Sequence, residues 1–138
     1  MAAFALDHVN LQTARTDQMV AFYRDIVGLE LGARPDFDVP GAWLYLGDLA
    51  AVHLVTLRAG LQPKEPQIEH FAFRCRGLKR FTALCREKRV PYYVAIVPGL
   101  DIRQVNVFDP DGNKVEMQFE ATDDPDTDLS PHLMQAPA

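Results

Sequence analysis

The chain has 138 residues, enough for one domain or for two small modules that share a core. Apolar residues make up 48% of it, and the formal net charge is −5, which argues against a nucleic-acid partner. The sequence has no signal peptide pattern and no apolar run near the ~20 residues that a membrane helix needs. These features predict a soluble, cytoplasmic protein that does not bind membranes.

The first half of the chain has the pattern of a strand, a helix and three further strands. Apolar and polar residues alternate where strands are expected, and apolar residues recur at helical spacing before Gly28, a residue suited to the left-handed end of a helix. The expected elements are a strand at 6–12, a helix ending at Gly28, a strand at 29–34, and a hairpin of 43–46 with 51–55.

The second half repeats this order. Its expected elements are a strand at 69–73, a helix over 78–85 that Pro91 ends, a strand at 92–96, and a hairpin of 105–108 with 114–119. The hairpin turns at Asp109–Asn113, where Pro110 fixes φ and Gly112 can take a positive φ. The predicted fold class is therefore α+β, with two tandem βαβββ modules that form a cupped mixed sheet with the helices outside.

The module boundaries follow from composition. We expect a single domain over 1–138, made of module one at about 4–58, a Pro-rich linker at 59–66, module two at about 67–120, and an acidic, solvated tail at 121–138.

The repeat singles out four polar residues. A shift of about 62 residues carries His8 onto His70, and a shift of about 63 carries His53 onto Glu116. Each of the four alternates with apolar neighbours, so each is expected on the polar face of its strand. Twofold pairing of the modules would bring all four together inside the cup.

Three imidazoles and one carboxylate are ligands that borderline divalent ions favour. We therefore predict one divalent metal ion (Zn, Ni, Mn, Co or Fe) at His8, His53, His70 and Glu116. Glu116 and His53 are the candidate catalytic residues, because a base must reach the proton that it moves. Five further residues are candidates for substrate contact: Asn10, Gln12, Arg74, Arg103 and Trp43.

Other chemistries lack their residues. The only serine is Ser130, in the tail, which argues against a serine-hydrolase triad, and no phosphate-binding loop is present. Cys75 and Cys85 are expected as reduced, structural thiols, and His132 as a solvated residue of the tail.

The residues also resemble a known family. The segments around Asp7–Val9, Phe22–Glu30, Glu69–Phe73 and Asp109–Glu116 are similar to the vicinal oxygen chelate superfamily, the group of glyoxalases, bleomycin-resistance proteins and extradiol dioxygenases. The resemblance covers about residues 4–120. It implies paired βαβββ modules, a homodimer, and one divalent ion that chelates two adjacent substrate oxygens. By position it implies His8, His70 and Glu116 as ligands, with His53 at a fourth position where glyoxalase I has a glutamate.

The function predicted from these observations is that of a metal-dependent enzyme with lyase or isomerase chemistry on a small substrate with vicinal oxygens, through a metal-stabilised enediolate. Two alternatives stay open. One is an Fe(II) dioxygenase of the extradiol type that uses two histidines and a carboxylate. The other is a non-catalytic binding protein of the bleomycin-resistance type. The sequence does not specify the substrate, the ion, or whether the ligands of one site come from one chain or two.

Overall fold

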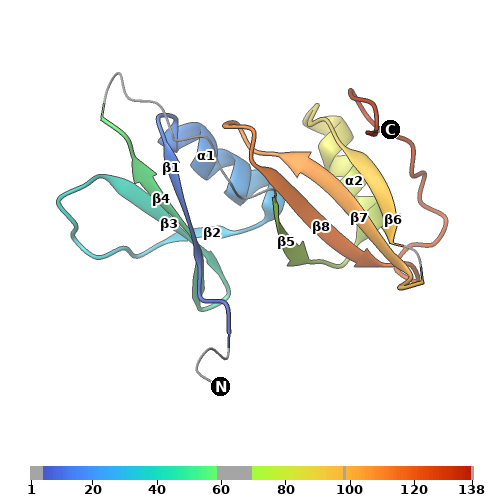
Figure 1. The fold of residues 1–138 in the computed structure, drawn as a ribbon, viewed down its shortest axis with the longest axis horizontal. Coiled ribbons are helices and arrows are strands. Elements are labelled where there is room, and N and C mark those ends of the chain that lie inside the picture. Colours follow the sequence, from blue (N-terminus) through green and yellow to red (C-terminus); the bar gives the residue numbers. More distant parts are fainter. Residues whose placement is uncertain (1–4, 59–69, 98, 138) are drawn as a thin grey trace. The chain divides into compact units, whose positions relative to one another are not determined.

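The computed structural model describes residues 5–58, 70–97 and 99–137. The chain divides into two compact units, Met1–Pro66 and Gln67–Ala138, and each contains one four-stranded sheet (Figure 1). We call these units module one and module two. The predicted linker at 59–66 lies outside the described residues.

Module one has the predicted βαβββ order. Its sheet has the strand order β1-β4-β3-β2, in which β1 runs parallel to β4 and the other pairs are antiparallel. The elements are β1 (Val9–Thr13), α1 (Thr16–Phe22), the π-helix η1 (Tyr23–Val27), β2 (Glu30–Gly32), β3 (Gly41–Leu46) and β4 (Leu49–Thr56).

The apolar face of module one forms its core. Leu44, Val52 and Leu54 of the sheet are fully buried, as is Met19 of α1. The helix ends as the sequence predicts, at Gly28 with φ 91°, and the Leu29 N–H then donates to the Tyr23 carbonyl at 2.8 Å. The sequence pattern did not predict that the last turn widens into a π-helix.

Module two repeats the arrangement. Its strand order is β5-β8-β7-β6, with β5 parallel to β8 and the other pairs antiparallel. The elements are β5 (His70–Arg74), α2 (Leu78–Glu87), β6 (Tyr93–Val97), β7 (Ile102–Phe108) and β8 (Lys114–Glu120). The predicted α+β fold with two βαβββ modules is confirmed.

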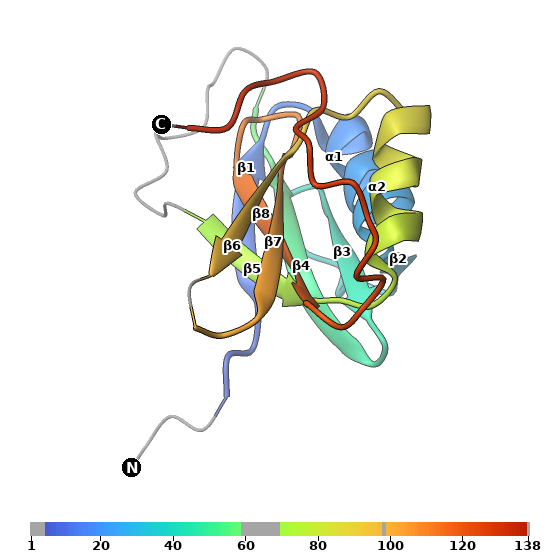
Figure 2. The ribbon, with the colours of Figure 1, turned by 90° about the vertical axis from the view of Figure 1, so that its right-hand side faces the viewer.

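Helix α2 covers one face of the second sheet (Figure 2). Its buried residues are Leu78, Phe81, Thr82 and Cys85, and the Phe81 ring packs on Phe119 of β8 at a centroid distance of 5.8 Å. Because Val115, Met117 and Phe119 all point to this side, Glu116 and Gln118 point to the opposite face of the sheet.

The sequence suggested a solvated acidic tail, but two of its aspartates accept hydrogen bonds from the start of α2. Asp123 Oδ2 accepts hydrogen bonds from the Gly77 and Leu78 N–H groups at 2.6 and 3.3 Å, and Asp124 Oδ2 accepts one from the Lys79 N–H at 3.1 Å. These N–H groups are at the start of α2 and have no partner within the helix. Asp123 and Asp124 therefore cap a helix of their own module. The tail then runs alongside α2 (Figure 2).

His132 is also held rather than free in solvent. Its N–H donates to the Tyr92 carbonyl at 2.9 Å, and its carbonyl accepts from the Tyr92 N–H at 3.0 Å. The Tyr92 side chain is fully buried next to Arg86 of α2. This bridge fastens the tail to the chain just before β6.

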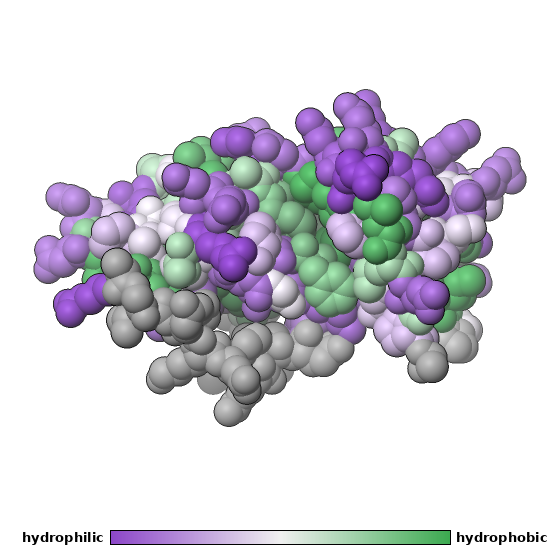
Figure 3. All heavy atoms as spheres, turned by 90° about the horizontal axis from the view of Figure 1, so that it is seen from above, coloured by the Kyte–Doolittle hydropathy of each residue, from purple (hydrophilic) through white to green (hydrophobic). Residues whose placement is uncertain are grey.

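The surface is mixed in character. Figure 3 shows hydrophilic side chains over much of the face that it displays, with apolar ones between them. Some large apolar residues are exposed, among them Leu31 at 53% and Ile96 at 61%. None of the described helices is long and apolar enough to span a bilayer.

Candidate metal and substrate site

In module one, the polar face of the sheet carries a row of three predicted site residues. The register pairs Asn10 of β1 with His53 of β4, and His53 with Trp43 of β3. Directly paired residues share a face, so all three project to the same side. Gln12 lies two residues along β1 on that side. His8 lies one residue before β1, so the first strand is shorter than expected.

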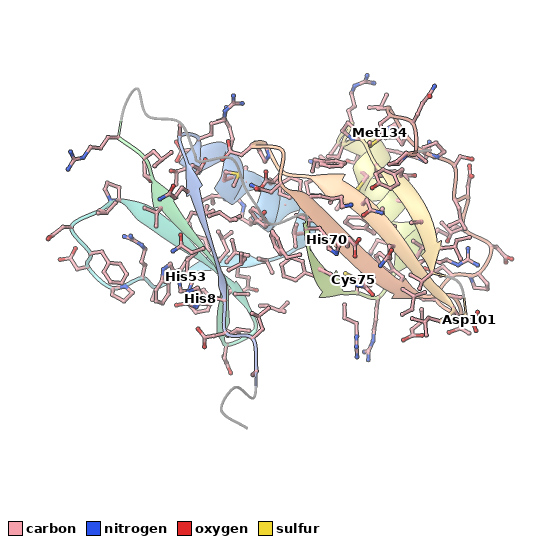
Figure 4. All side chains as sticks on the ribbon, in the orientation of Figure 1. His8, His53, His70, Cys75, Asp101 and Met134 are labelled. Atoms are coloured by element: carbon pink, nitrogen blue, oxygen red, sulfur yellow. The ribbon has the colours of Figure 1, made fainter. Side chains whose placement is uncertain are left out.

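The rings of His8, His53 and Trp43 are stacked; Figure 4 labels His8 and His53, which lie close together. The imidazoles of His8 and His53 have centroids 3.8 Å apart and an interplanar angle of 11°. On the other side of His53, the Trp43 ring stacks at 4.0 Å and 12°. The structure brings His8 and His53 together within module one, and Trp43 stacks on the other side of His53, a contact that the sequence did not predict.

Asp7 fixes one nitrogen of His8. Asp7 Oδ2 lies 2.6 Å from His8 Nδ1, a distance at which a protonated Nδ1 donates to the carboxylate. A ring that donates through Nδ1 and carries no proton on Nε2 has its lone pair on Nε2, which is the arrangement that metal-binding histidines commonly have. Burial and the neighbouring His8 lower the pKa of His53, so His53 is neutral and also retains a lone pair at neutral pH.

In module two, His70 and Glu116 form the second pair. His70 is the first residue of β5, and Glu116 pairs with Ala72 of β5 and Asn106 of β7. His70 Nε2 lies 3.4 Å from Glu116 Oε2. Since the pair joins the first and last strands of its module, it occupies the place that His8 and His53 occupy in module one.

Two residues of β7 that the sequence analysis missed, Gln104 and Asn106, lie next to Glu116. Gln104 Nε2 donates a hydrogen bond to Glu116 Oε2 at 3.1 Å. Asn106 is only 2% exposed, and its Oδ1 has no hydrogen-bond partner among the described residues. The signal was present in β7, because Gln104 and Asn106 alternate with the apolar residues of that strand and face Gln118 and Glu116 across the hairpin.

Glu116 itself is buried, with 6% exposure, although it lies on the polar face. A buried carboxylate is costly unless charged or hydrogen-bonding groups surround it. His70 and Gln104 provide such groups, and this local environment differs from that of an ordinary exposed sheet glutamate.

One predicted site residue lies on the wrong side. Arg103 pairs with Phe119, so it projects to the apolar face, away from Glu116. The prediction that Arg103 shares the face of the site is therefore wrong. Arg74 pairs with Gln118 and does lie on the face of Glu116.

Within each module, the donor set can be compared with what a metal requires. Ligand atoms bound at about 2.0–2.2 Å, with angles of about 90–109° between them, stand about 2.9–3.5 Å apart, and the His70–Glu116 separation of 3.4 Å fits this range. The His8–His53 stack does not, because parallel imidazoles at 3.8 Å direct their lone pairs side by side rather than at one point. A ring of this pair must rotate before both can bind one ion. Within the described part of the chain, no three His, Cys, Asp or Glu residues form a cluster able to hold a metal.

Comparison with known proteins places the chain in a family. The model of the Glyoxalase/Bleomycin resistance protein/Dioxygenase superfamily matches residues 5–117. The chain belongs to this superfamily, which confirms the resemblance seen in the sequence. No curated protein matches the chain.

Solved structures show the same fold. A glyoxalase family protein from Bacillus anthracis matches with a TM-score of 0.70 and 20% identity, over 86% of this chain and 96% of that one. The trypanothione-dependent glyoxalase I of Leishmania major matches with a TM-score of 0.65 and 20% identity, over 87% of this chain and 89% of that one. A fosfomycin resistance protein from Listeria monocytogenes matches with a TM-score of 0.65 and 17% identity, over 84% of this chain and 93% of that one. At these identities the likeness concerns the fold alone.

Proposed function

We propose that this protein is a divalent-metal-dependent enzyme that performs lyase or isomerase chemistry on a small substrate with vicinal oxygens. The observation that carries the proposal is the equivalence of two donor pairs. His8, one residue before β1, lies against His53 of β4, and His70, the first residue of β5, lies against Glu116 of β8. The family supports it, because its members typically use divalent metals and include lactoylglutathione lyases.

His8, His70 and Glu116 are the proposed ligands, and His53 is the proposed fourth. The ion, when bound, would act as a Lewis acid that polarises a substrate carbonyl. Asp7 holds the His8 ring in the tautomer that binds through Nε2. Rotation of the His53 ring out of its stack would let it bind or leave the ion.

Glu116 is the proposed base. Its Oε2 accepts from Gln104, which fixes the orientation of the carboxylate, and its burial strengthens electrostatic interactions at its oxygens. A proton on the carbon beside a polarised carbonyl is acidic enough for a carboxylate within hydrogen-bond distance to remove it. In an isomerase Glu116 would return this proton to the neighbouring carbon; in a lyase it would pass the proton to the departing group, whose bond to the neighbouring carbon breaks as the carbon–carbon double bond forms.

Metal analysis of the purified protein tests the ligand set. The protein is loaded separately with Zn²⁺, Ni²⁺, Mn²⁺, Co²⁺ and anaerobic Fe²⁺, dialysed, and assayed for bound ion. We expect His8→Ala and Glu116→Gln to lose the ion. The matched controls are His132→Ala and Glu87→Gln, a histidine and an exposed glutamate outside both pairs, and these should retain it. An ion content that His8→Ala and Glu116→Gln leave unchanged refutes the proposal.

Activity separates the proposed chemistry from the alternatives. Proton NMR in D₂O detects exchange of the C–H beside the carbonyl of small α-hydroxy ketones, and we expect exchange by the metal-loaded protein and its loss in Glu116→Gln. Oxygen uptake with catechols by the iron form would instead identify a dioxygenase. Ligand binding that His8→Ala and Glu116→Gln leave intact, without turnover, would identify a binding protein.

We also propose that the protein is a homodimer, since members of its superfamily often are. Sedimentation equilibrium of the full chain tests this. Location in the cytoplasm stays a prediction from the sequence.

A further inference from the structure

A pocket lies in module two at the carboxyl ends of β5 and β8. Its lining includes Arg74 and Arg76 from the end of β5 and the segment after it, and Gln118 and Glu120 from β8. No described residue forms an ion pair or hydrogen bond with either guanidinium group. Among the described residues, the pocket therefore presents two guanidinium groups without a partner, of the kind that bind planar anions in a bidentate manner.

The pocket continues the face that carries Glu116. Arg74 pairs with Gln118, and Gln118 with Gln104, so these three form the row next to that of Ala72, Glu116 and Asn106. Rows on one face are about 7 Å apart along a strand. Gln104 connects the two rows directly, because its side chain reaches back to Glu116.

The charges limit what the pocket can hold. Arg74 and Arg76 contribute two positive charges, and Glu120 contributes one negative charge, so the excess is one positive charge. An excess of one suits a monoanion such as a carboxylate, whereas the Glu120 carboxylate opposes a phosphate dianion. Cys75 also lines the pocket, but burial raises the pKa of its thiol to about 11, so the pocket is suited to binding rather than to covalent capture.

We propose that this pocket binds a carboxylate group of the substrate, with Arg74 as the main contact and Arg76 as the second. The assignment of this carboxylate to the substrate rests on the proposed function, while the binding of a carboxylate does not. The substrate class becomes a small acid whose carboxylate lies about 7–10 Å from its reacting oxygens, one row along the sheet. Arg74 would then determine specificity without touching the reacting atoms.

The test uses the full chain, treated with a chelator, so that no metal is needed. Butyrate, the neutral butyramide and inorganic phosphate are titrated while the backbone amide signals of Cys75, Gln118 and Glu120 are followed by NMR. We expect saturable shifts with butyrate in the millimolar range, none with butyramide, and weaker shifts with phosphate. Arg74→Gln should weaken butyrate binding about tenfold, since a hydrogen-bonded charge pair is lost.

Two further variants sharpen the result. Arg80→Gln removes an exposed arginine of the same module outside the pocket and should leave butyrate binding unchanged. Glu120→Gln should tighten butyrate binding several-fold and improve phosphate binding more. Equal affinities in wild type and Arg74→Gln, or tighter binding of phosphate than of butyrate by the wild type, would overturn the inference.

The outcome is independent of the metal experiment. Butyrate binding without metal binding would retain the carboxylate pocket and remove the enzyme proposal. Metal binding with no butyrate binding would retain the enzyme proposal and remove the carboxylate pocket.

Discussion

Replacement of Asp123 by alanine should destabilise the protein by about 2 kcal/mol. The carboxylate accepts hydrogen bonds from two N–H groups at the start of α2, at 2.6 and 3.3 Å. Loss of a helix N-cap costs about 0.5–2 kcal/mol, and loss of a negative charge at a helix N-terminus costs about 0.3–1 kcal/mol more. For a chain of this size, the sum corresponds to a fall in melting temperature of about 6–10 °C.

Urea unfolding followed by far-UV circular dichroism measures the change, and hydrogen exchange of the Leu78 amide reports the cap itself. Asp126→Ala is the matched control, because it removes the same charge from an exposed tail residue with no hydrogen bond recorded in the described structure. Asp123→Asn keeps an acceptor oxygen and loses the charge, so it should show an intermediate loss. Equal stabilities of Asp123→Ala and Asp126→Ala would refute the assignment of Asp123 as a cap.

Four further predictions follow from other parts of the structure. Trp43 is the only tryptophan and stacks on His53, so loading with metal should change its emission, and His53→Ala should abolish that change; an unaltered response in this variant would contradict it. Burial raises the pKa values of Cys75 and Cys85 to about 11 and about 12, so at pH 8 thiolate is scarce and a disulfide reagent should label the native chain more than about 100-fold more slowly than the urea-unfolded chain. The thiol of Cys75 should favour the native state up to about pH 9 and lose this contribution as the pH rises through 11, which urea unfolding at pH 8 and pH 10.5 will show by comparison with Cys75→Ala. Gly28→Ala should cost about 1–2 kcal/mol of unfolding free energy from backbone strain alone, since φ is 91° and an added Cβ meets nothing within 4 Å; Gly28→Asn should lose less.

Alternation and helical spacing were sufficient to predict both modules. The apolar residues of β4 and β8 point to the core at every second position, and this period separates His53 and Glu116 from their neighbours. The comparison of one half with the other then singled out the four candidate ligands, which a single strand would not reveal.

Contacts between distant segments were beyond the reach of such patterns. Asp123 caps a helix that begins 45 residues earlier in the chain, and nothing local to Asp123 specifies that partner. The stack of Trp43 on His53 depends on side-chain rotation as well as on register. The prediction for Arg103 failed for a different reason, because the alternation within β7 was not applied to it. Arg103 is next to Gln104 in the strand, so the two side chains project to opposite faces of the sheet.

The parallel strand pairs have a consequence for the order of folding. Val9 pairs with Val52, and Phe71 with Val115, so in each module the first strand must wait for nearly the whole module before it can join the sheet. Loop closure of this length is unfavourable until the intervening hairpin and helix are in place. Each donor pair consists of residues from the two segments that such a parallel strand pair brings together. An ion bound by all four residues would connect both strand pairs, so its binding would require that the first and last strands of both modules have already paired.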